Sequence, residues 1–160
     1  MKKSKQPAEY YAETLKKSKL PKLRKFQEKL YLLSDPNDWI VKDIGYIASL
    51  YSTHNKCFQV YGIYMHWVRH KNEIYHEGLL DLLDYILTRI DYENLAFQNF
   101  HNYLYFFRKT LIEIIGKFFK TGDILFRIKI NQYIASWERG GIIHDTFMWE
   151  IIEEMKRYLK

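Results

Sequence analysis

The stretch LLDLLDYILTRI, residues 79–90, lies near the middle of the chain and carries two interleaved patterns. Apolar residues recur at helical spacing and predict one buried stripe: Leu79, Leu82, Leu83, Ile86 and Ile90. Polar residues recur at helical spacing on the opposite side: Asp81, Asp84, Tyr85 and Thr88. The pattern predicts a helix that is buried along one stripe and either solvated or ligand-facing along the other. An ordinary amphipathic helix and the floor of a groove both fit it.

The composition favours a single helical domain. The chain has 160 residues, of which 48% are apolar and 18% aromatic, so it is long and apolar enough to bury a sizeable core. It contains only 7 Gly and 3 Pro, which favours helices over a turn-rich β fold. A single cysteine, Cys57, excludes an internal disulfide and favours a reducing compartment. No apolar run is long enough for a membrane span, and the N-terminus lacks the apolar segment of a secretory signal.

Helical spacing of apolar residues predicts about eight helices joined by short loops. They are expected at about residues 21–33, 38–51, 57–70, 79–90, 92–107, 109–120, 124–139 and 146–159. The break SDPND at 34–38 offers Asp35 as an N-cap, and Asp123 after Gly122 marks another helix start. Residues 71–77 are expected to form a connecting loop. The fold class is therefore all-α.

The positive charge is concentrated at the N-terminus. Residues 1–25 hold nine Lys/Arg and two Glu, whereas the rest of the chain holds 16 basic and 17 acidic residues. We therefore divide the chain into a basic tail, 1–21, and a helical domain, 22–160. The near-neutral domain argues against a nucleic-acid footprint over its whole surface. The tail is either a solvated terminus or a contact for RNA or another acidic partner through six lysines: Lys2, Lys3, Lys5, Lys16, Lys17 and Lys19.

The residues indicate a binding module, not an enzyme. His66 and His70 share the i, i+4 spacing of some metal sites, but no HExxH motif or cysteine cluster accompanies them, so we expect no metal and no cofactor. His54 and Cys57 lie three residues apart without a recognisable third partner, which favours a small buried thiol over a nucleophile. No phosphate-binding glycine loop or GxSxG motif occurs.

Three segments together resemble the RNA polymerase II CTD-interacting domain. They are FQEKLYLLSDPNDWIVKDIGYIASLY at 26–51, LLDLLDYIL at 79–87 and RIKINQYIASWERGGII at 127–143. Leu83-Asp84-Tyr85-Ile86 is similar to the family's Leu-Asp-Ser-Ile in its fourth helix. Arg127 and the later Trp137 are similar to the arginine and closing tryptophan of its seventh helix. The resemblance covers about residues 23–160, and the order and spacing of the segments carry it, because each motif alone is degenerate.

The resemblance implies a right-handed superhelix of eight helices, similar to ENTH and VHS domains. Its second, fourth and seventh helices would line a groove for the heptad-repeat tail of RNA polymerase II, often phosphorylated. At the position of Asp84 the family has an aspartate that accepts a hydrogen bond from the peptide's tyrosine hydroxyl. A turn-forming Tyr-Ser-Pro segment would dock in such a groove. The peptide-binding residues expected here are Lys42, Tyr46, Asp84, Tyr85, Thr88, Arg89, Asn131 and Gln132. The resemblance further implies a nuclear, monomeric factor in co-transcriptional RNA processing or termination.

The sequence also departs from the family pattern at the positions that read phosphate. Tyr85 and Arg89 stand where the family has Ser and Asn. Asp38 opens the second helix where an arginine can meet phosphate, and Gln132 replaces an arginine of the seventh helix. A carboxylate repels phosphate, and Gln lacks the charge-assisted fork of Arg. The domain is therefore expected either to read another phosphorylation state, through Lys42 or Arg89, or to have lost phosphopeptide binding, as in divergent spliceosome-associated members.

Two other functions fit the same sequence. One is an ENTH/VHS-type adaptor that binds membrane lipid or sorting peptides, which the basic tail would suit although no strong amphipathic membrane face is present. The other is a helical scaffold without a peptide groove. The observation that separates the scaffold from the peptide binder is whether Asp84, Arg89 and Gln132 converge on one surface.

Overall fold

The computed structural model describes residues 22–53, 56–90 and 103–159, and this part of the chain is all-α, as predicted. Its α-helices are α2 (Leu23–Leu30), α3 (Asp38–Thr53), α4 (Cys57–His70), α5 (His76–Tyr85), α7 (Tyr103–Thr121), α8 (Ile124–Arg139) and α9 (Asp145–Lys156). Three short helical segments join them: η1 (Tyr31–Ser34), η2 (Glu73–Tyr75) and the π-helical η3 (Ile86–Ile90). Within these ranges, every helix is too short or too polar to cross a membrane.

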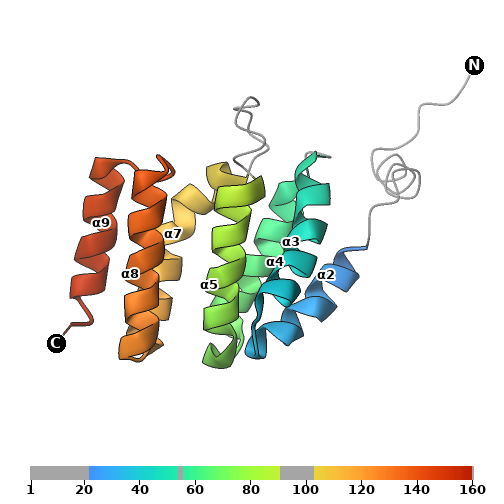
Figure 1. Ribbon diagram of the computed structural model, residues 1–160, viewed down its shortest axis with the longest axis horizontal. Helices are drawn as coiled ribbons and strands as arrows, with labels where there is room; N and C mark the ends of the chain where they lie inside the picture. The colour runs from blue at the N-terminus through green and yellow to red at the C-terminus, as the bar shows by residue number, and fades with distance from the viewer. Residues whose placement is uncertain (1–21, 54–55, 91–102, 160) are drawn as a thin grey trace, which may run out of the picture.

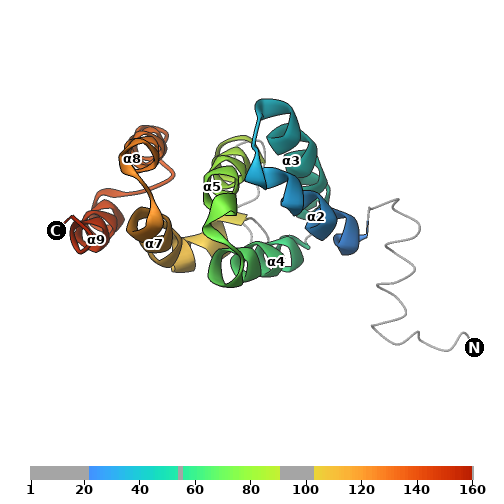
Figure 2. The same cartoon turned by 90° about the horizontal axis from the view of Figure 1, so that it is seen from below.

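The helices are arranged in two layers. Figure 1 shows α3, α5 and α8 side by side at the front, with α4 and α7 behind them and α9 at the C-terminal end. Figure 2, viewed from below, shows α3, α5 and α8 along one side and α4, α7 and α9 along the other. The helices of the front layer are the second, fourth and seventh of those predicted from the sequence. The handedness and superhelical form that the resemblance implies stay a prediction.

The central segment packs as its pattern predicts. All five residues of its apolar stripe are buried: Leu79, Leu82, Leu83, Ile86 and Ile90. The opposite side, with Asp81, Asp84, Tyr85 and Thr88, is only half-buried. The helix thus contributes one side to a core that includes the fully buried rings of Trp67 and Trp137, and leaves its polar side facing outward between α3 and α8.

Helix starts follow local hydrogen bonding, with one correction. The Asp123 side chain accepts a hydrogen bond from the backbone N–H of Phe126 at 2.8 Å, so Asp123 is the N-cap of α8, as predicted. The predicted cap Asp35 is wrong for α3. There, the Asn37 side chain accepts from the backbone N–H of Ile40 at 2.9 Å. An Asx cap accepts from the N–H two or three residues ahead, and Asn37 has that spacing from the first turn of α3 whereas Asp35 does not.

Two predicted boundaries also change. The expected break at residues 107–109 is wrong, because α7 runs without interruption from Tyr103 to Thr121. Arg108 and Lys109 are exposed on this helix, and no proline or glycine interrupts it there. The expected loop 71–77 contains η2 and the first residues of α5. The remainder of the predicted helix 92–107 and the basic tail lie outside the described residues.

Candidate functional site

A small pocket opens where the polar side of α5 meets α3 and α8. Its volume is about 80 Å³, enough for the end of one side chain but not for a cofactor. The residues that line it come from the three front helices and from η3: Asp38, Val41, Lys42, Asp81, Asp84, Tyr85, Arg89 and Tyr133. Four of the eight residues predicted to bind peptide are among them, namely Lys42, Asp84, Tyr85 and Arg89. We call this the α3–α5–α8 pocket.

The two aspartates of α5 differ in how much hydrogen-bonding capacity they have left. The Asp81 carboxylate accepts from the Tyr133 hydroxyl and from Lys129, whose Nζ lies 2.9 Å from Oδ1 and 3.1 Å from Oδ2. Lys129 also contacts Glu77 Oε1 at 3.0 Å, so this lysine joins two turns of α5 to α8. Asp81 is therefore used inside the protein, where it fixes the distance between α5 and α8.

Asp84 is the carboxylate that remains available to a ligand. Its Oδ1 accepts a hydrogen bond from the buried Trp137 indole, Nε1 to Oδ1 2.9 Å. Its Oδ2 has no hydrogen-bond partner among the residues that the structure describes. A carboxylate that is held by one oxygen and open at the other is a positioned acceptor, because its orientation is fixed before a ligand arrives. Asp84 can thus accept a hydrogen bond from a hydroxyl or N–H placed in the pocket.

The electrostatics of the pocket follow from its partial burial. Burial raises the pKa of Asp84; the Trp137 hydrogen bond and the Arg89 charge lower it, and the Asp81 charge raises it, with a net increase. Burial, together with the hydrogen bond to Asp81, raises the pKa of the Tyr133 hydroxyl, which stays protonated as a donor. Burial lowers the pKa of Lys129, but its hydrogen bonds to Asp81 and Glu77 outweigh this and raise it. Lys129 is therefore a permanent cation opposite Asp81.

Tyr85 forms the wall of the pocket next to α3, and a glycine makes room for it. A Cβ atom added to Gly45 of α3 would overlap the Tyr85 ring, so only glycine lets the ring lie directly on the α3 backbone. The Arg89 guanidinium sits over the Tyr85 ring, 5.1 Å from its centroid, in cation–π geometry. Gly45 and Arg89 thus both contact the Tyr85 ring at the edge of the pocket.

The rim carries two exposed cations. Lys42 and Arg89 both line the pocket, both are exposed, and within the described ranges neither forms a salt bridge. Asp38, in the first turn of α3, lies on the same rim and brings the opposite charge. The pocket therefore presents an acceptor at Asp84 and two cations that an anionic group of a ligand could contact.

The other four predicted residues do not line the pocket. Tyr46 is exposed on α3, and the Thr88 hydroxyl donates to the backbone carbonyl of Asp84 at 2.7 Å. Asn131 and Gln132 are exposed on α8. Asp84 and Arg89 therefore line one pocket and Gln132 does not, so the three residues whose convergence separates a peptide binder from a scaffold do not all meet there.

Sequence reasoning expected α8 in the site but did not identify the residues by which it contacts α5. The three residues that face α5 are Lys129, Tyr133 and Trp137, spaced four apart on one side of α8, with the Tyr133 and Trp137 rings stacked at 6.1 Å. A lysine, a tyrosine and a tryptophan at i, i+4 and i+8 are hydrogen-bond donors on one side of the helix. Glu77, Asp81 and Asp84 form a matching row of acceptors on α5. This match between donors and acceptors is the signal that could have identified the three α8 residues.

Within the described ranges, no group of three His, Cys, Asp or Glu side chains is placed to hold a metal ion. His66 and His70 are exposed, with their ring centroids 4.9 Å apart. Cys57 is buried, as expected.

Comparison of the chain with family models, with curated proteins and with solved structures finds no significant match.

Proposed function

We propose that this protein is a peptide-binding module of the CTD-interacting type. It would capture the heptad-repeat C-terminal tail of RNA polymerase II, in one phosphorylation state, along α3, α5 and α8. Its role would then be in co-transcriptional RNA processing or termination in the nucleus, without chemistry of its own. The proposal combines the resemblance of residues 26–51, 79–87 and 127–143 with the geometry of the α3–α5–α8 pocket.

The observation that carries the proposal is the state of Asp84. The resemblance assigns this aspartate the role of accepting the peptide's tyrosine hydroxyl, and one of its oxygens is open at a pocket of side-chain size. The neighbouring Asp81 has the same charge but is engaged by Tyr133 and Lys129. A carboxylate with one oxygen held inside the protein and the other uncommitted can accept a hydrogen bond from a ligand without breaking an internal contact.

The rim suggests how phosphate would be read. Lys42 and Arg89 would supply the cations, and Asp38 would repel a phosphate placed beside it. A phosphate bound at the rim would therefore lie on the side of Lys42 and Arg89, so one serine position of the heptad should bind more tightly than the others. A pocket without this asymmetry would not discriminate among the positions.

The test is fluorescence anisotropy of the full chain with two-repeat heptad peptides. One peptide is unphosphorylated, and three carry phosphate on the serine after tyrosine, on the serine after threonine, or on the last serine. We expect one phosphopeptide to bind with a Kd in the micromolar range. Lys42→Gln and Arg89→Gln should each weaken it about three- to tenfold, because each removes one partly exposed cation contact.

Lys120→Gln is the matched control, since Lys120 is an exposed lysine at the end of α7, away from the pocket. It should bind as the unchanged protein does. If none of the four peptides binds at concentrations of hundreds of micromolar, the proposed ligand is wrong. If a phosphopeptide binds but all three variants behave alike, the assignment of the phosphate contacts to the rim is wrong.

A further inference from the structure

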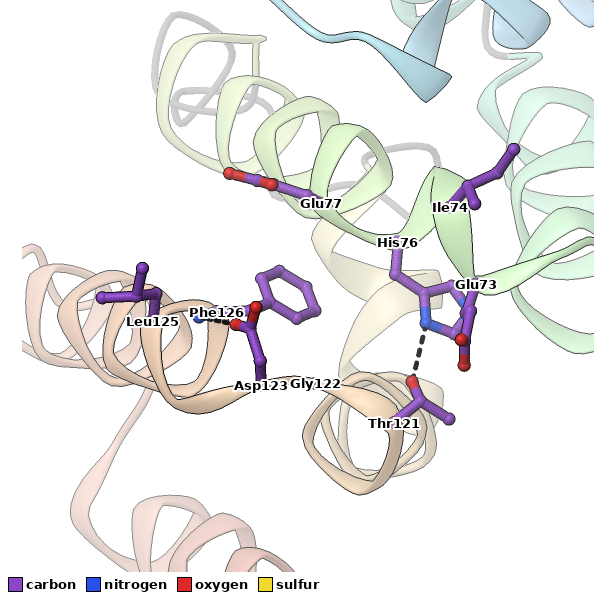
Figure 3. Close-up of a pocket in the computed structure, with 9 residues that line it drawn as sticks. All are labelled: Glu73, Ile74, His76, Glu77, Thr121, Gly122, Asp123, Leu125 and Phe126. Atoms are coloured by element: carbon purple, nitrogen blue, oxygen red, sulfur yellow. Dashed lines mark hydrogen bonds between the residues drawn. The ribbon is translucent and has the colours of Figure 1, made fainter.

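A second pocket, larger than the first, lies where the start of α5 meets the end of α7 and the start of α8. Its volume is about 490 Å³, within the range of small-ligand and peptide sites. Figure 3 shows the Phe126 ring and the His76 imidazole on opposite sides of it, with Glu77 on α5 and Asp123 at the start of α8. We call it the α5–α7–α8 pocket. None of the residues expected to bind peptide from the sequence lines it.

The pocket combines apolar walls with negative charge. Ile74 and Leu125 line it although 56% and 77% of their surfaces are exposed, and Figure 3 shows these two aliphatic side chains at opposite ends of the pocket. Its charged lining residues are three carboxylates, those of Glu73, Glu77 and Asp123, and no lysine or arginine is among the described residues that line it. Exposed aliphatic groups beside like charges are typical of a surface that a complementary partner covers.

His76 forms the back of the pocket and adds no positive charge. It is 3% exposed, and burial together with the Lys117 charge lowers its pKa to about 4, so the ring is neutral near pH 7. Thr121 donates its single hydroxyl proton to the Lys117 carbonyl at 3.1 Å, so it accepts the 3.1 Å hydrogen bond from His76 Nδ1. Nε2 is then a buried acceptor with no partner in the described part of the chain.

A salt-bridge network separates the two pockets. Lys129 contacts both Glu77, which lines the α5–α7–α8 pocket, and Asp81, which lines the α3–α5–α8 pocket. Of the three carboxylates of the pocket, Glu77 is paired with Lys129, and Asp123 accepts a hydrogen bond from the backbone N–H of Phe126. The Glu73 carboxylate has neither kind of partner among the residues described. Glu73 is exposed in η2, so a cation can reach it without disturbing the core.

We propose that the α5–α7–α8 pocket is a second peptide-docking site, which takes a segment with one aliphatic residue next to one lysine or arginine. The aliphatic side chain packs against Leu125 on α8, and the cationic side chain reaches Glu73 on η2. The site is independent of the proposed function, because it shares no lining residue with the α3–α5–α8 pocket.

The test is two-dimensional ¹⁵N–¹H NMR of the full chain, titrated with three blocked dipeptides. The probes are N-acetyl-Leu-Lys-amide, N-acetyl-Leu-Glu-amide and N-acetyl-Leu-norleucine-amide, which share the leucine and differ in charge. We expect N-acetyl-Leu-Lys-amide to shift the amides of Glu73, His76 and residues 122–126, with a Kd on the order of 1 mM. The glutamate probe should produce no saturable shift, and the norleucine probe should bind more weakly than the lysine probe.

Glu73→Gln should weaken the lysine probe about threefold, as expected for one exposed charge pair. Glu150→Gln, at an exposed glutamate of α9, is the matched control and should leave it unchanged. Equal binding of the lysine and norleucine probes, or no saturable shift around the pocket from the lysine probe, would overturn the proposal. Neither result bears on the heptad peptides, whose contacts lie on the other side of Lys129.

Discussion

Replacing Asp84 by asparagine is expected to abolish most of the peptide affinity while leaving the fold as stable as before. Asparagine keeps the shape of the side chain, and its carbonyl can still accept the hydrogen bond from the Trp137 indole. The second oxygen becomes an NH₂ group, which cannot accept a hydrogen bond from a tyrosine hydroxyl. The change thus removes the proposed ligand contact and preserves the internal one.

The magnitudes separate the two effects. A hydrogen bond to a charged acceptor contributes about 1.5–3 kcal/mol, so Kd should rise by about 10- to 150-fold. The loss of the Asp84 charge has a different effect on the free energy of unfolding. The pKa of Asp84 is raised on folding, chiefly by burial, so its ionisation opposes folding at any pH above its usual range. Asparagine carries no such cost but makes a weaker bond to Trp137, and we expect the free energy of unfolding to change by less than about 1 kcal/mol.

The assay pairs isothermal titration with the tightest heptad peptide and urea unfolding followed by circular dichroism. Asp35→Asn, at an exposed aspartate between η1 and α3, is the matched control and should change neither quantity. Unchanged affinity in Asp84→Asn would refute the assignment of Asp84 as the ligand's acceptor. A loss of more than about 2 kcal/mol in stability would show instead that the carboxylate is needed for the fold.

Three further substitutions test individual contacts of the structure. Gly45→Ala should displace the Tyr85 ring and weaken heptad-peptide binding at least about threefold by titration, and unchanged affinity would contradict the proposed wall. Tyr133→Phe should cost about 1–2 kcal/mol in urea unfolding, because Asp81 loses a donor; no cost would mean that Lys129 alone satisfies it. The pKa of His76 is lowered to about 4 in the folded protein from an ordinary 6.5, so the unfolded chain binds the proton first and stability falls as pH drops through this window. His76→Gln should remove about 2 kcal/mol of the stability loss between pH 7.5 and 5, and an unchanged pH dependence would contradict a buried neutral imidazole.

Features of the front layer could be predicted where the sequence pattern within a single helix indicates them. The spacing of Leu79, Leu82, Leu83 and Ile86 indicates the buried side of α5 without reference to any other segment, and Asp123 marks the start of α8 by a local hydrogen bond. Asp84 was placed on the polar side by the same periodicity. These features depend on residues within one or two helical turns of each other. Sequence periodicity carries information over that range.

The pairing of α5 with α8 was not predictable in the same way. The contacts of Asp81 with Tyr133 and of Asp84 with Trp137 join residues more than 50 positions apart, and one helix alone does not show which donor meets which carboxylate. Nothing in the sequence marks a break at Arg108: no breaker is present, and the buried residues Tyr103, Phe107, Leu111 and Ile114 keep helical spacing across it. The larger pocket depends on three helix ends meeting, which no local pattern encodes.

The most direct test of the central claim is to locate where the heptad peptide binds. In an assigned ¹⁵N–¹H NMR titration of the full chain with the tightest heptad peptide, the account predicts that shifted amides cluster around Lys42, Asp84, Tyr85, Arg89 and Tyr133, on the three front helices. Saturable shifts confined to other surfaces, or none at millimolar peptide, would contradict the claim that the α3–α5–α8 pocket is a peptide-binding site.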